Sequence, residues 1–70
     1  MFDEVFWQIA EREDIDEWYE LFDSELFYKV EEEIARRVGL YWNDENDLYL
    51  MLCDNVNGFE EWYDEMAEDL

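Results

Sequence analysis

The residues of this sequence that could do chemistry are carboxylates, and they are densest in its last fourteen residues. Residues 57–70 hold six acids and no Lys or Arg, in two series spaced by four: Glu60, Asp64 and Glu68, and Glu61, Glu65 and Asp69. On a helix, positions four apart share a face and lie about 6 Å apart along the axis. The spacing therefore predicts two neighbouring rows of like charge, whereas an ordinary solvated helix face mixes both signs.

Catalysis is not expected from these acids. Paired carboxylates need a cleft and contrasting environments for acid–base or glycosidic work. The chain has no His, the commonest proton shuttle, and its single Cys53 lies in no CxxC motif. The acidic stretches that begin at Asp44 and Asp54 lack the residues of an EF-hand calcium loop. We expect no enzyme activity, no cofactor and no dedicated metal site.

The composition indicates one folded domain, residues 1–70. Half of the residues are hydrophobic, and fourteen of them are aromatic. A disordered acidic tail would be poor in aromatic residues. Large rings bury much apolar surface for little backbone, which suits so short a chain.

The net charge of −19, from 23 acids and four bases, sets the kind of partner to expect. A compact chain of this length is about 28 Å across. Duplex DNA of that length carries about 16 phosphates. Because such a charge destabilises a compact state, it indicates a strongly basic partner or a very salty environment. Direct binding of nucleic acid is disfavoured, since phosphates would be repelled.

Cysteine usage and hydropathy bear on location. A single cysteine rules out an internal disulfide and suits a reducing cytosol, and its apolar neighbours suggest that Cys53 is buried. The first residues, MFDEVFWQ, show no basic leader and no uninterrupted apolar run. We expect a cytoplasmic protein with no membrane contact.

Hydrophobic periodicity predicts helices over 2–12, 14–22 and 24–38, with a break at Asp23-Ser24. One unbroken helix over 14–38 is the alternative. Gly39 is suited to end the helix, because glycine adopts the left-handed conformation beyond a helix C-terminus and two arginines precede it.

The next segment changes character. A polar turn at 43–47 separates two apolar runs, which predicts a β-hairpin with strands at 40–43 and 48–53. A helix over 47–55 is the alternative. Asn57, with Glu60 three residues on, is the expected N-cap of a last helix. The predicted fold is α+β, with three or four helices packed on a hairpin in the order α-α-α-β-β-α, and all-α is the alternative.

The remaining charges extend the pattern. Lys29, Arg36 and Arg37 each follow a glutamate by four residues, which should neutralise them locally, while residues 40–70 carry ten acids and no base. Acids of the 43–47 turn and of the second helix are expected to enlarge the partner-binding surface of the last helix. The added residues are Asp44, Glu45, Asp47, Asp14, Asp16, Glu17 and Glu20. Tyr41 and Trp42, beside the turn, are candidate aromatic contacts, although core packing is the favoured interpretation for both.

Small size, acidity, many aromatics and carboxylate rows together resemble the phage-encoded DNA-mimic proteins, which include anti-CRISPR and anti-restriction inhibitors. The stretch DLYLMLCDNVNGF, residues 47–59, resembles a strand and acidic turn of the ArdA antirestriction family, although Asn55 and Val56 replace its Tyr-Glu pair. This resemblance implies a bacterial target that binds DNA: a CRISPR effector, at its PAM-recognition site, or a restriction enzyme.

Two other interpretations stay open. One is an acidic interaction or immunity module whose basic partner does not bind it as a DNA mimic. The other is adaptation to high salt with an unrelated task. The chain could act as a monomer or as a homodimer.

Overall fold

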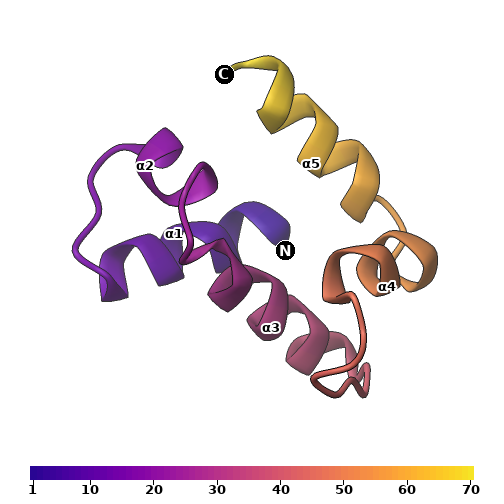
Figure 1. Ribbon diagram of the computed structural model, residues 1–70. Helices are drawn as coiled ribbons and strands as arrows, with labels where there is room; N and C mark the ends of the chain where they lie inside the picture. Colours follow the sequence, from indigo (N-terminus) through magenta and orange to yellow (C-terminus); the bar gives the residue numbers. More distant parts are fainter.

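The protein is entirely helical. The computed structural model describes residues 1–70 and contains five α-helices and no strand (Figure 1). The helices are α1 Phe2–Arg12, α2 Trp18–Phe22, α3 Phe27–Val38, α4 Leu48–Asn55 and α5 Phe59–Glu68. The predicted α+β fold with a β-hairpin is therefore wrong, and the structure matches the all-α alternative.

The first three helices follow the periodicity, with the second and third shortened. Helix α1 has the predicted bounds, but α2 begins only at Trp18 and α3 only at Phe27. The backbone turns at Asp14, which has the left-handed φ of 58°, and is extended at Glu17. The break after α2 is confirmed, because Ser24 Oγ donates to the Leu21 carbonyl and accepts from the Leu26 N–H. A single helix over 14–38 is thereby excluded.

Gly39 ends α3 as expected. Its φ is 76°, and the next amide, that of Leu40, reaches back 2.9 Å to the Ala35 carbonyl. This satisfies carbonyls that the helix end would leave without partners. Arg36 and Arg37 occupy the last turn, where positive charge is favoured.

The predicted hairpin is a loop followed by α4. The Asp47 side chain accepts a hydrogen bond from the Leu50 N–H at 3.3 Å and so caps the helix. Within the loop, Asn43 Oδ1 accepts from the Glu45 N–H at 2.9 Å and closes a local turn. The run 48–53 fits a strand and a helix alike, but a cap at Asp47 and burial of Leu52 against the core favour the helix.

The predicted N-cap of α5 is also displaced. Gly58, not Asn57, precedes the helix, with a φ of 85° and no side-chain cap. A Cβ built on Gly58 would lie 3.6 Å from the Phe2 ring, an ordinary contact, so the left-handed φ and not crowding is what favours glycine here.

Thirteen buried residues, all apolar, form one core. Helix α3 packs against α1 and α4, while α2 and α5 rise on opposite sides above them (Figure 1). Phe6 of α1 and Phe59 of α5 are fully buried, and the rings of Phe2 and Phe59, with centroids 5.9 Å apart, join the two ends of the chain. Beyond Phe59, α5 buries no further residue, so most of its apolar side is only partly covered.

Candidate acidic interaction surface

The two series of acids near the C-terminus lie on the outer side of α5. All six are exposed, and all but Asp69, which follows the last turn, belong to the helix. We call them the α5 acidic rows: Glu60, Asp64 and Glu68, and Glu61, Glu65 and Asp69. The helix that the spacing required is confirmed.

A groove of about 670 Å³ runs beside these rows where α4 meets α5. Five members of the rows line it, all except Asp69, together with the segment 53–58. Asp54, from the last turn of α4, adds a sixth carboxylate that the sequence analysis missed. The hairpin expectation placed this residue at a strand end, whereas a helix over 47–55 would have brought it to the turn before α5.

Cys53 also lines the groove. It is half-buried and packs against the core, so the expected burial is only partial. Burial raises the pKa of the Cys53 thiol. A hydrogen bond with Tyr49 lowers this pKa, whereas the charges of Glu60, Asp54 and Asp64 raise it further. Because the thiolate is the nucleophile, this thiol is poorly reactive at neutral pH.

Three of the four basic residues form ion pairs away from the α5 acidic rows, and Arg12 forms none. Lys29 on α3 pairs with Glu13 after α1, a contact that raises the pKa of Lys29. Arg36 and Arg37 both reach Glu33, at 2.5 and 3.1 Å, and Arg37 also lies 3.7 Å from Glu4 on α1. Of the three predicted pairs, only Arg37 with Glu33 is observed. These bases bind α3 to the α1 side of the molecule and leave the α5 acidic rows without counter-charge.

The acids of the 43–47 segment lie on the loop that leads into α4. Asp44, Glu45 and Asp47 are all exposed, and Asp47 also caps α4. The negative charge of Asp47 also acts on the carboxylate of Glu31 on α3. Burial, followed by the charges of Asp47 and Glu32, raises the pKa of Glu31 to about 7. This partly buried, unneutralised carboxylate was not predicted, because nothing local distinguishes Glu31 from its neighbours Glu32 and Glu33.

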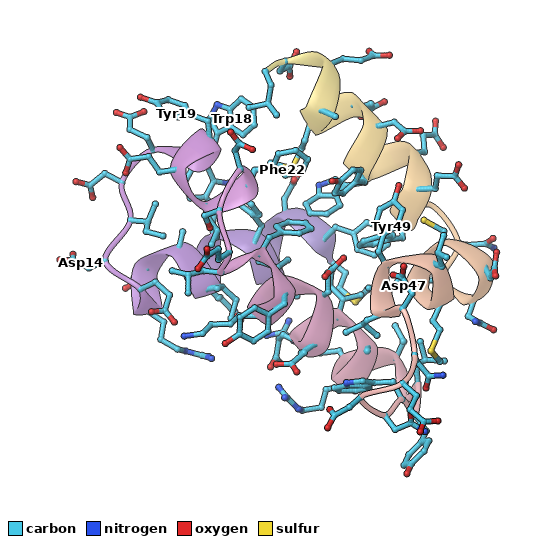
Figure 2. All side chains as sticks on the ribbon, viewed as in Figure 1. Asp14, Trp18, Tyr19, Phe22, Asp47 and Tyr49 are labelled. Atoms are coloured by element: carbon cyan, nitrogen blue, oxygen red, sulfur yellow. The ribbon has the colours of Figure 1, made fainter.

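The other predicted acids form a separate region. Asp14, Asp16 and Glu17 lie on the link between α1 and α2, and Glu20 lies on α2; all four are exposed. Figure 2 shows Asp14 and Asp47 at opposite sides of the molecule. In Figure 1 the link between α1 and α2 also lies across the molecule from α5, so the structure does not join this link, the Asp14 region, to the α5 acidic rows.

The two candidate aromatic residues behave differently. Tyr41 is 83% exposed, so core packing is wrong for it. Trp42 is half-buried and packs against the core, as favoured. Tyr41 is therefore available for contact beside the acidic loop.

None of the five helices combines the length and the apolar character that crossing a membrane requires. The carboxylates and the cysteine form no group of three or more that could hold a metal ion. Comparison with known proteins finds no matching family model, curated protein or solved structure.

Proposed function

We propose that this protein is a DNA-mimic inhibitor that occupies the DNA-binding surface of a bacterial defence protein in the cytoplasm. A CRISPR effector, at its PAM-recognition site, and a restriction enzyme are the candidate targets. The observation that carries the proposal is the acidic groove with the α5 acidic rows, because no base of the chain pairs with any of them.

Size and charge support this proposal together. The longest extent of the molecule is 30 Å. At one phosphate per ~1.7 Å of axis, a duplex of that length carries about 18 charges. The chain carries a net charge of −19. A groove whose Lys and Arg side chains fit a short duplex would therefore meet a similar amount of negative charge on this protein.

Helices suit this role because they hold carboxylates in place. Lys and Arg side chains that grip phosphates also form charge-assisted hydrogen bonds with carboxylates, which arginine can bind in bidentate fashion. Association would be steered by the opposite charges of the two surfaces and would weaken with added salt. No chemical step is needed, since exclusion of DNA is sufficient for inhibition.

The test is competition with DNA for a candidate target, measured by mobility shift. We expect the protein to displace duplex DNA. The triple variant Glu61→Lys, Asp64→Lys, Glu65→Lys should not displace it. The matched control reverses three acids of the separate region, Asp16→Lys, Glu17→Lys and Glu20→Lys, which changes the net charge from −19 to −13 just as the first variant does.

The two variants differ only in where the three reversed charges lie. If both lose competition equally, total charge matters and the α5 acidic rows are not the binding surface. Circular dichroism should show both variants folded, because every replaced side chain is exposed and each replacement reduces self-repulsion.

The separation of the Asp14 region from the α5 acidic rows favours a second candidate function. An acidic interaction or immunity module could contact a basic partner through two separate acidic surfaces, whose carboxylates need not match the arrangement of phosphates in duplex DNA. Simultaneous binding of DNA and this protein to one target would support the module and exclude the mimic.

A further inference from the structure

The inner side of α5 continues past the core as a partly open aromatic surface. Phe59 is fully buried, Tyr63 and Met66 are half-buried, and Leu70 is 62% exposed. These residues repeat every three or four positions, so they share one side of the helix and its extension. The apolar side of α5 is therefore longer than the core that covers it.

Helix α2 supplies the opposite border of this surface. Trp18 is half-buried and Tyr19 is 47% exposed. Phe22 joins the two helices, since its ring centroid lies 6.1 Å from that of Trp18 and 4.9 Å from that of Tyr63. Figure 2 shows Trp18 and Phe22 between α2 and α5, and Tyr19 at the outer edge of α2 beside Trp18, whose ring centroid lies 6.1 Å from that of Tyr19. We call the partly exposed members of this set, which lie over the buried Phe22, the aromatic face: Trp18, Tyr19, Tyr63, Met66 and Leu70.

The charges of carboxylates from three elements act on Tyr63, the central ring of the aromatic face. Burial raises the pKa of the Tyr63 phenol, and the charges of Glu31, Asp64 and Asp23 raise it further. These acids come from α3, from α5 and from the turn after α2. The chain's observed ion pairs use Lys29, Arg36 and Arg37 with Glu13, Glu33 and Glu4, so none of the three acids receives a base.

We propose that the aromatic face is a docking surface for arginine side chains of the basic partner, whose guanidinium groups stack on its rings and pair with Asp23, Glu31 and Asp64. This inference rests on the proposed function for the existence of a basic partner. Charge complementarity identifies the occupant, because each copy of the chain carries −19 and a second copy would add its repulsion.

Arginine fits this surface better than lysine for a physical reason. The guanidinium is planar, weakly hydrated and able to stack on a ring while it donates to a carboxylate. The lysine ammonium is a compact, strongly hydrated charge. The aromatic face should thus add a preference for arginine to the general attraction of the α5 acidic rows for any cation.

The test uses the full chain with two probes of equal charge, deca-arginine and deca-lysine, by isothermal titration calorimetry at low salt. We expect deca-arginine to bind about three- to tenfold more tightly, the range that one ring–cation contact provides. Tyr63→Leu, which keeps apolar packing, and Tyr19→Ser, at an exposed site, should each reduce that ratio and leave deca-lysine affinity unchanged. Tyr28→Leu is the control, because Tyr28 is 49% exposed on α3 outside the aromatic face.

The outcomes separate this inference from the proposed function. An unchanged arginine preference in both Tyr63→Leu and Tyr19→Ser would overturn the docking of arginine on the rings, even if the protein still displaced DNA from its target. A lost preference with no displacement of DNA would support the docking surface and contradict DNA mimicry. Sedimentation that shows a dimer, abolished by Tyr19→Ser, would assign the aromatic face to a second copy and overturn the proposal.

Discussion

Glu31 offers the sharpest test of how charge limits the stability of this fold. Its carboxylate lies partly buried on α3, and the charges of Asp47 and Glu32 act on it while its own charge reaches Tyr63. None of the observed ion pairs includes it. Substitution by glutamine keeps the shape of the side chain and removes the charge at every pH.

The magnitude follows from the pKa. A pKa raised from 4.5 to about 7 would correspond to about 3 kcal/mol in full. Because the side chain remains in part accessible to water, which screens its charge, we expect about 1–2 kcal/mol. For a chain of this size, that stabilisation raises the melting temperature by about 7–14 °C.

The direction in pH follows from proton binding. The folded state holds the Glu31 proton more tightly than the unfolded state, so the free energy of unfolding falls as pH rises from about 4.5 to about 7. Glu31→Gln should therefore be more stable than the parent at pH 8 and equally stable near pH 4. Thermal melts followed by circular dichroism at both values measure this difference.

The matched control is Glu25→Gln, at an exposed position between α2 and α3. It removes the same charge and relieves only general repulsion, for which we expect at most about 0.5 kcal/mol. Equal stabilisation by the two substitutions at pH 8 would refute the assignment of a special cost to Glu31.

Two further predictions concern the whole fold and one turn. Raising NaCl from about 0.02 to 0.5 M should increase the melting temperature, because ions screen the repulsion among the acids; a melting temperature that does not change with salt would contradict this. Gly39→Ala should lower the free energy of unfolding by about 1 kcal/mol in urea titrations, because φ is 76° although nothing lies within 4 Å of the added methyl group. Exposed Val38→Ala, at the last residue of α3, is the control, because a helical backbone accepts alanine without strain; an equal loss there would argue against backbone strain at Gly39.

Local patterns were sufficient for some elements and not for others. The periodicity of α1, the break at Ser24 and the left-handed Gly39 each depend on a few neighbouring residues, and each is observed. The apolar residues of the run 48–53 fit the period of a helix and that of a strand. Its helical state therefore depends on the cap at Asp47 and on burial of Leu52 by distant residues. Sequence periodicity alone could not decide between the two.

The same distinction applies to the candidate site. The α5 acidic rows follow from spacing on a single helix. The groove requires the angle between α4 and α5, which depends on the left-handed Gly58 and brings Asp54 beside the rows. The surroundings of Glu31 and Tyr63 combine three helices, and no single segment of the sequence contains that information.

The uneven placement of the four bases has a consequence for how the chain holds together. Ion pairs join α3 to the α1 side. Helix α5 carries only negative charge and is held by the packing of Phe59, Trp62 and Tyr63 and by one hydrogen bond, which the Trp62 Nε1–H donates to Asp3 on α1 at 2.8 Å. Local opening should therefore begin at the C-terminal helix while the α1–α3 unit stays closed. A partner that binds α5 would then stabilise the least stable helix of the fold. Binding and the folding of α5 would be coupled.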